Sequence, residues 1–180
     1  MPVPFRDARR EESSPEAGYL RFMQEERGRG IRGALFLINA RGEPVDFAYS
    51  RIDLPALVLW RSGDARRHAL AGLSAVLFDA SLRAPALLLA LADEVPADLF
   101  TDELLVDIPL CRVHADMAKR YLPIRTGDLE ESPAAPMVTW VGDAPVGASP
   151  GNRLLEMLTA RDLLAEPFAR AAAGLEEAYR

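Results

Sequence analysis

Two neighbouring segments with the pattern of β-strands constrain the fold of this chain more than any other feature. Residues 31–38 are almost wholly apolar, whereas large apolar side chains alternate with small or polar ones over residues 45–50. The connection between them, NARG at 39–42, ends at Gly42, which favours the left-handed backbone of a hairpin turn. The pattern predicts a β-hairpin whose first strand lies inside a sheet and whose second strand has one wetter face.

A short helix is predicted before this hairpin. Pro15 stands where a first helical turn begins, and Ser14 precedes it as an N-cap. Gly28 and Gly30 then stop the helix. Apolar residues between these signals would form its buried side.

Further elements are predicted after the hairpin. Asp64 is the expected N-cap of an amphipathic helix that reaches Ala80, because apolar residues recur there at helical spacing. Pro109 is expected to end a strand or to place it at a sheet edge. The remaining predicted elements are strands at 56–60, 86–91, 104–108 and 137–141, and helices that open at Ser149–Pro150 and at Pro167.

This order of elements predicts an α/β (α+β) fold. A single mixed β-sheet of about five to six strands, led by the hairpin, would carry helices packed against it and a C-terminal helical segment. The order resembles that of roadblock and longin-like dimerisation modules. It also resembles the ribonuclease H-like fold, in which a hairpin-led strand trio precedes a helix and a fourth strand. No family motif accompanies either resemblance, so each concerns topology alone.

The length suits one domain. A chain of 180 residues can bury a core large enough to fold without a disulfide or a metal. We expect residues 1–14 to form a flexible N-terminal arm, because they are polar and rich in Pro, Arg and Glu. The α/β core is expected over 15–150, with a mobile, polar loop at 116–136, and the C-terminal helices over 151–180.

Composition excludes several classes of protein. The net charge of −6 argues against a protein that coats nucleic acid, since such binding depends on Lys and Arg. The single cysteine, Cys111, excludes an intrachain disulfide and a zinc site built from cysteines. Lys119 is the single lysine among 21 basic residues, a skew that favours a GC-rich bacterial genome and is also compatible with a warm habitat.

The same composition predicts a cytoplasmic protein. The start of the chain lacks the apolar segment of a secretory signal. The uncharged apolar run at 84–92 is far shorter than the roughly 20 residues that cross a bilayer. We therefore expect no membrane partner.

Two carboxylates follow the predicted strand at 86–91. Asp93 and Glu94 stand where the resemblance to ribonuclease H-like nucleases implies a metal-binding acid. Two-metal chemistry needs several converging acids, and the predicted first strand contains none. Asp46 on the second strand is the nearest substitute. No catalytic residue is therefore predicted in the leading interpretation, and Asp93, Glu94 and Asp46 form the site of an alternative one.

Neither a metal site nor a cofactor is predicted elsewhere. Cys111, His114 and Asp116 lie close together, but in an extended segment Cys111 and His114 point to opposite faces. His68 is the only other histidine. A buried thiol near a surface histidine is the simpler interpretation.

Two further patterns are candidate anion-binding features. The glycine-containing loop at 142–152 precedes a helix start, where Ser149, Gly151 and Asn152 could contact an anion, although the loop lacks the ending of a phosphate-binding P-loop. Six arginines could form a local basic patch, the one feature through which nucleic acid could bind: Arg27, Arg29, Arg32, Arg61, Arg66 and Arg67.

The leading functional hypothesis is a non-catalytic protein-interaction or accessory subunit, either a homodimer or part of a larger prokaryotic assembly. Apolar residues in the C-terminal helices exceed what one short helix needs and could form the contact surface: Leu154, Leu155, Leu158, Leu163, Leu164 and Phe168. The alternative is a nucleic-acid-processing or nucleic-acid-binding protein with a degenerate ribonuclease H-like core. The third hypothesis is a nucleotide or anion sensor that uses the loop before Asn152.

Overall fold

A computed structural model describes most of the chain, namely residues 15–25, 28–54, 59–96, 98–104, 106–114, 138–145 and 147–180. The predicted arm at 1–14 and the loop at 116–136 lie outside these residues. In chain order the elements are β1 (Glu16–Gln24), β2 (Gly30–Asn39), β3 (Pro44–Asp53), α1 (Ser62–Ala80), β4 (Leu87–Leu91), a π-helical turn η1 (Leu99–Glu103), β5 (Leu110–Val113), β6 (Val138–Val141), α2 (Pro150–Ala160) and α3 (Glu166–Ala178).

The strands form one mixed sheet in the order β3-β2-β1-β4-β5-β6. The trio β1, β2 and β3 is antiparallel, β4 runs parallel to β1 and β5 parallel to β4, and β6 is antiparallel to β5. The predicted fold class, a single mixed sheet with helices, is confirmed. A strand trio followed by a helix and a fourth strand is also the order on which the ribonuclease H-like resemblance depended.

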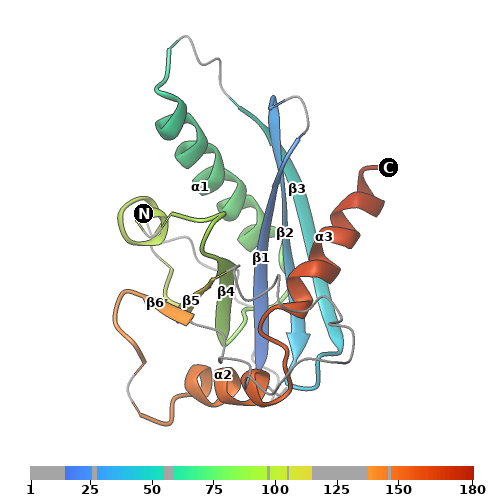
Figure 1. Ribbon diagram of the computed structural model, residues 1–180, viewed down its shortest axis with the longest axis vertical. Helices are drawn as coiled ribbons and strands as arrows, with labels where there is room; N and C mark the ends of the chain where they lie inside the picture. The colour runs from blue at the N-terminus through green and yellow to red at the C-terminus, as the bar shows by residue number, and fades with distance from the viewer. Residues whose placement is uncertain are drawn as a thin grey trace, which may run out of the picture.

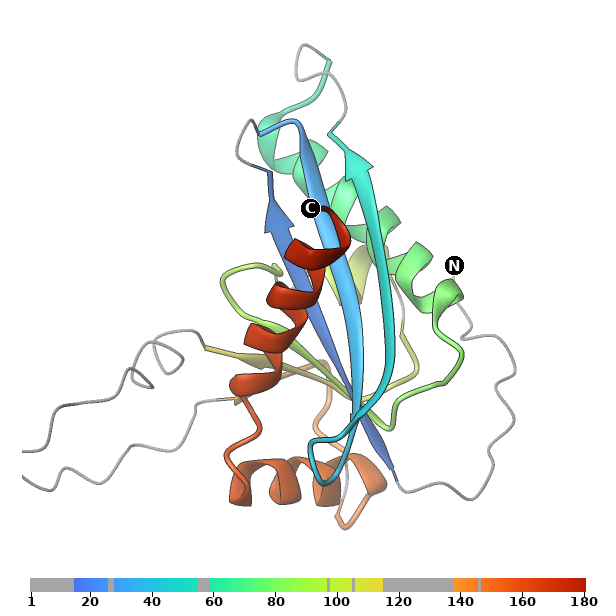
Figure 2. The same cartoon turned by 90° about the vertical axis from the view of Figure 1, so that its right-hand side faces the viewer.

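Helices cover the sheet from both sides. Figure 1 shows α1 on one side of the strand trio and α3 on the other, with α2 lying across one end. Turned by 90°, α3 is seen to run along β1 and β2 (Figure 2). None of the helices within the described residues is long and apolar enough to cross a membrane.

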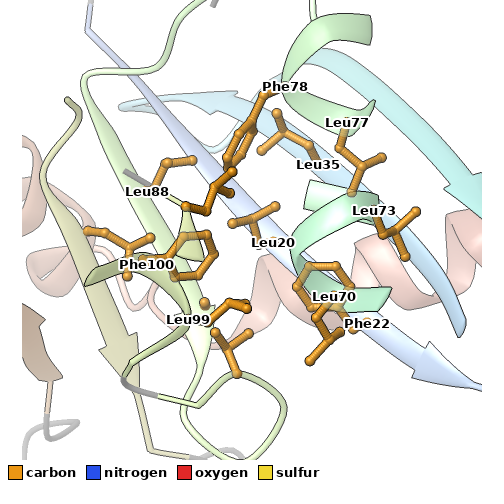
Figure 3. Packing of buried hydrophobic residues seen from close by; sticks show 14 of the residues in the cluster. Leu20, Phe22, Leu35, Leu70, Leu73, Leu77, Phe78, Leu88, Leu99 and Phe100 are labelled. Carbon is orange, nitrogen blue, oxygen red and sulfur yellow. The ribbon is translucent and has the colours of Figure 1, made fainter. Parts of the chain in front are cut away.

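One hydrophobic core lies between the sheet and α1 (Figure 3). From α1, Leu70, Leu73 and Phe78 point at the sheet, and each is at most 1% exposed. Leu20 of β1 is fully buried beneath them. The segment around η1 closes the side of this core with Leu99 and Phe100.

A second core fills the opposite face, beneath α2 and α3. Tyr19 of β1 packs edge-on against Phe168 of α3, with ring centroids 5.0 Å apart. Leu158 of α2 is fully buried against the same cluster. Because both faces of β1 and β2 are covered, these strands are apolar on both sides.

The predicted hairpin is confirmed. β2 lies between β1 and β3 and is almost entirely buried, while β3 is half-exposed and forms one edge of the sheet. Gly42 has the expected left-handed backbone, with φ of +85°. The Asn39 side chain accepts from the backbone N–H of Arg41 and of Glu43, which holds the turn.

The helix predicted after Pro15 is wrong, because Glu16–Gln24 forms strand β1. Residues of the strand alternate between the two cores: Tyr19 faces α3, and Leu20 and Phe22 face α1. Burial of both faces hides the alternation that identifies a strand from sequence. Pairing with β2 on one side and β4 on the other therefore overrides the local helix signals.

The strand predicted at 104–108 is also wrong. β5 begins at Leu110, directly after Pro109, so the proline precedes the strand instead of ending it. Leu104 is buried against the α1-side core, so the apolar residues of this segment cover the core without joining the sheet. Of the strand predicted at 56–60, residues 56–58 are outside the described chain, and Leu59 and Trp60 form a bend.

The other predicted elements are confirmed with shifted ends. α1 begins at Ser62 with Arg61 at the N-cap position, so Asp64 lies in the first turn. There its charge suits the helix dipole. Ser149 caps α2 by accepting from the backbone N–H of Asn152, as expected.

Candidate functional site

A pocket opens on the α3 side of the sheet. Its volume is about 550 Å³, within the range of small-molecule sites in proteins. The walls come from β1, the end of β4, the α2–α3 connection and the first turn of α3. The lining residues are Arg21, Leu91, Arg161, Asp162, Leu163, Ala165, Glu166, Phe168 and Ala169.

Pairing in the sheet positions the floor of this pocket. Leu20 of β1 lies opposite Ala90 of the parallel strand β4, so Arg21 and Leu91 follow side by side. Arg21 points to the α3 face because its neighbour Leu20 points to the α1 face. The positively charged Arg21 side chain therefore lies at the edge of the apolar core on the α3 side.

Two hydrogen bonds position the α2–α3 connection above the floor. The Tyr19 hydroxyl donates to the Leu163 carbonyl at 2.6 Å. Arg161 Nη1 donates to the Ala40 carbonyl, in the β2–β3 turn, at 2.9 Å. Between them, Asp162 has a left-handed backbone with φ of +59°, which turns the chain at the pocket wall. Burial raises the pKa of Tyr19 well above its ordinary value, so its hydroxyl stays a donor.

Arg21 is held by the end of β4. Its guanidinium forms an ion pair with one carboxylate oxygen of Glu94, and the other oxygen accepts from the Phe22 backbone N–H at 2.8 Å. Burial lowers the pKa of Arg21, and the nearby charge of Asp93 opposes that shift. Nε of Arg21 is buried and has no hydrogen-bond partner within the described chain. A buried donor of this kind is costly unless a ligand or water satisfies it.

The other charges around the pocket are unevenly paired. Glu166 pairs with Arg170, whose Nε lies 2.9 Å from Oε1. Arg161, by contrast, contacts a neutral carbonyl and has no carboxylate partner among the described residues. The walls formed by Leu91, Leu163 and Phe168 are apolar. The arrangement can therefore hold an apolar group and place an anion beside Arg161 and Arg21.

The structure brings together two of the three carboxylates of the predicted nuclease site. Asp93 and Glu94 lie beside Arg21 at the end of β4. Asp46 lies on β3, where it accepts from the Leu82 N–H at 3.1 Å and from Ser81 Oγ at 3.3 Å. These hydrogen bonds fix the turn after α1. Because β3 is separated from β1 by β2, Asp46 lies apart from Asp93 and Glu94. No group of three His, Cys, Asp or Glu side chains in the described residues could hold a metal ion.

The predicted anion-binding loop before α2 uses its donors internally. The Asn152 backbone N–H donates to Ser149 Oγ, and its side-chain amide donates to the carbonyls of Pro145 and Gly147 at 2.8 Å each. Gly151 is buried close to the Ala86 carbonyl. The loop thus behaves as a capped connection.

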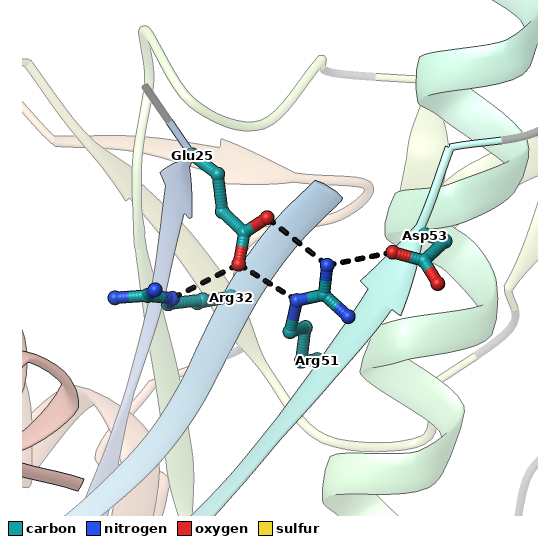
Figure 4. Close-up of polar contacts among 4 residues, drawn as sticks. All are labelled: Glu25, Arg32, Arg51 and Asp53. Atoms are coloured by element: carbon teal, nitrogen blue, oxygen red, sulfur yellow. Dashed lines mark hydrogen bonds and ion pairs between the residues drawn. The ribbon is translucent and has the colours of Figure 1, made fainter. Parts of the chain in front are cut away.

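The predicted basic patch divides into two places. Arg32 lies on β2 in a network with Glu25, Arg51 and Asp53 (Figure 4). Its guanidinium also stacks over the Tyr179 ring, 4.8 Å from the centroid. Arg32 is therefore neutralised on the α3 side of the sheet.

The remaining arginines surround the start of α1 and the β1–β2 turn. Arg66 donates to the Gln24 side chain at 3.3 Å, and Arg67 pairs with Asp98 at 3.2 Å. Arg29 and Arg61 are exposed. Arg27 lies outside the described residues.

The structure corrects the predicted contact surface on the C-terminal helices. Four of its six residues are at most 3% exposed, and the other two pack against the same α3-side core. The four are Leu154, Leu158, Leu164 and Phe168, and the two are Leu155 and Leu163. These residues looked surplus because β1, which forms part of the sheet face that they cover, was expected to be a helix.

Cys111 and His114 lie on and just after β5. Burial raises the pKa of the Cys111 thiol to about 12, so the thiol is a buried apolar group. His114 Nε2 lies 2.9 Å from Thr139 Oγ1 of β6. Asp116 lies outside the described residues.

Sequence reasoning missed Arg21 and Arg161. Arg21 was placed in a helix, where a charged residue among apolar ones lies on the solvated side. The sequence did contain one signal: Arg21 lies between the apolar residues Leu20 and Phe22. In a strand, neighbouring side chains point to opposite faces, so Arg21 would lie on the face opposite to that of Leu20 and Phe22.

No protein-family model and no curated protein matches this chain. Among solved structures, the chain is similar to an endonuclease V from Bacillus subtilis, at 13% sequence identity and a TM-score of 0.38. The likeness covers 65% of this chain and 50% of that one, so it spans half the length of the endonuclease. A likeness of that extent carries no argument about fold or activity.

Proposed function

We propose that this chain is a non-catalytic binding protein that takes a small molecule with an apolar body and an acidic group into the α3-side pocket. The observation that carries the proposal is Arg21, whose buried Nε has no partner within the described residues beside an apolar cavity of about 550 Å³. A carboxylate, sulfonate or phosphate group in the cavity would lie beside the guanidinium groups of Arg21 and Arg161, which both line it.

Charge supports an anion at one end of the ligand. Two arginines and two acids line the pocket: Arg21 pairs with Glu94 and Glu166 with Arg170, whereas Arg161 has no ion pair with a carboxylate within the described residues, although Asp162 also lines the pocket. An apolar body would pack on Leu91, Leu163 and Phe168. The proposal retains the idea of an anion sensor and moves its site from the loop before Asn152 to the pocket.

A direct test uses 8-anilinonaphthalene-1-sulfonate, a fluorescent probe with an apolar body and an anionic group. Ala169 lines the pocket and is exposed, so Ala169→Leu should fill the cavity without disturbing the fold. We expect the probe to bind the unaltered protein and to bind this variant at least about tenfold more weakly. Ala173→Leu, also exposed on α3 but outside the pocket, is the matched control.

A second pair of variants tests the charge. Arg161→Ala should weaken binding by about tenfold or more, as expected for a lost charge-assisted hydrogen bond. Arg153→Ala, an exposed arginine on α2, should leave affinity unchanged. Decanoate should displace the probe and decanol should not. Equal displacement by both, or unchanged binding by Ala169→Leu, would refute the proposal.

Nucleic-acid processing at Asp93 and Glu94 is a second candidate function. It is supported by the position of these two acids at the end of β4, beside the central strand of a ribonuclease H-like element order. A metal there would have to compete with Arg21 for Glu94. This function predicts that Mg²⁺ or Mn²⁺ raises the unfolding midpoint and that Asp93→Ala removes the effect. Absence of a metal-dependent shift and of any DNA or RNA cleavage would eliminate it.

A further inference from the structure

We propose that two copies of this chain associate by pairing their β3 strands antiparallel, so that their sheets join into one. β3 is ten residues long and forms the end of the sheet. An edge strand of that length is a template for another strand. The proposal is independent of the pocket.

Hydrogen bonds show which residues of β3 face outward. The Leu54 N–H donates to the Arg29 carbonyl on the β2 side at 2.9 Å. Backbone groups alternate in direction along an antiparallel strand, so Ile52, Ser50 and Ala48 also face β2. The backbone N–H and C=O groups of Arg51 and Tyr49 must then point away from β2, toward the open edge of the sheet. The Phe47 N–H agrees with this direction, because it donates to the adjacent Asp46 carboxylate.

Exposed apolar side chains gather along this edge. Six large hydrophobic residues are exposed within the described chain, and three of them border β3. Tyr49 is on β3 itself and is 50% exposed. Val76 of α1, 51% exposed, is one turn beyond Gly72, where an added Cβ would lie 3.5 Å from Ile52 Cδ1 of β3. Leu82, 80% exposed, follows α1 and its N–H is bound by Asp46 of β3.

The position of these residues favours a second copy over an extended peptide. Val76 and Leu82 belong to the helix layer on one face of the sheet, and Tyr49 lies on the opposite face. A single added strand would occupy the plane between them and leave both layers uncovered. A second copy adds its own α1 layer and its own Tyr49.

The charges along β3 also allow two copies of the strand to pair. A two-fold axis through Tyr49 places Phe47 opposite Arg51 of the second copy. The backbone N–H and C=O groups that point outward from one copy then face those that point outward from the other. Asp46 lies opposite Ile52, and Asp53 lies opposite Val45. No like charges face each other, and the Arg51–Phe47 pair is favourable.

Sedimentation of the full chain over a range of concentrations tests the proposal. We expect a dimer that Val76→Asp weakens by at least about tenfold, because the symmetry brings the two added charges to one interface. Met157→Asp is the matched control, since Met157 is an exposed apolar residue on α2, away from β3. It should leave the dimer intact.

Tyr49→Pro supplies an independent variant. Its N–H points outward, so proline removes no hydrogen bond to β2 and should give a folded monomer with an unchanged circular dichroism spectrum. Ala48→Pro, by contrast, removes an inward-facing donor and should unfold the edge. An unaltered protein that remains monomeric at the highest concentrations overturns the proposal, as does a dimer unaffected by Val76→Asp and Tyr49→Pro.

Discussion

The two faces of the sheet are packed with similar apolar residues but differ in what else they contain. The α1 side is packed mainly with leucine and phenylalanine side chains (Figure 3), and the one buried polar side chain that α1 brings is Ser74, within the described residues. The α3 side contains a buried tyrosine hydroxyl, the Arg21–Glu94 ion pair and the pocket. Polar side chains at the edge of a core pack less closely than apolar ones, so they can leave a cavity between them. Under the proposed function, one face holds the fold together and the other accommodates a ligand.

The largest effect should come from truncating one phenylalanine on each face. Phe78 is fully buried on the α1 side, so Phe78→Ala leaves a sealed cavity and should destabilise by about 3–5 kcal/mol. Phe168 borders the pocket, so Phe168→Ala extends an existing opening and should cost about 3 kcal/mol or less. Urea unfolding measures both, and equal losses would contradict the difference between the faces.

Substitutions at two glycines, one on each face, test how closely the side chains pack between the sheet and each helix. A Cβ at Gly33 of β2 would lie 2.8 Å from Leu73 Cδ2 in the closed α1-side core, so Gly33→Ala should destabilise by about 1–3 kcal/mol. A Cβ at Gly174 of α3 would lie 2.7 Å from Phe47 Cζ, a partly exposed ring that can move. The gain of about 1 kcal/mol in helix propensity should offset that contact. If thermal unfolding ranks the two in reverse order, the α3 side is the more rigid one.

The tyrosine hydroxyl on the α3 side can be removed without changing the packing. Tyr19→Phe loses the hydrogen bond to the Leu163 carbonyl and should destabilise by about 1 kcal/mol. Because this bond positions the pocket wall, the affinity for the anilinonaphthalene probe should fall as well. Unchanged affinity would show that the α2–α3 connection is held by other contacts.

Substitution in the partly exposed network of Glu25, Arg32 and Arg51 should have the smallest effect on stability (Figure 4). The hydrogen bond from Arg51, followed by that from Arg32, holds the pKa of Glu25 below its ordinary value. Its contribution is therefore present above the unfolded pKa of about 4.3 and is lost as pH falls through the lower folded value. Glu25→Gln should destabilise slightly at pH 7, by well under about 1 kcal/mol.

This difference from the unaltered protein should shrink as the pH is lowered below 4. Thermal unfolding across that range measures it. A gap that widens in acid would mean that Glu25 is not stabilised as a carboxylate.

Local signals in the sequence were sufficient for elements whose pattern does not depend on distant partners. The hairpin at Gly42, the helix after Arg61 and the Ser149 cap were predicted because a turn, an amphipathic stripe and a capping hydroxyl act within a few residues. The strand at 87–91 was predicted because a short, wholly apolar run suits a strand buried on both faces.

Strand β1, the covered C-terminal helices and the pocket were decided only by the tertiary structure. Glu16–Gln24 is a strand because β2 and β4 pair with its two sides, a reason absent from its own residues. With β1 in the sheet, Leu154 and Phe168 have a complete sheet face to cover, and Arg21 lines the pocket together with Phe168. Composition and local pattern determined what could be buried, but long-range pairing determined which surfaces remained to be covered.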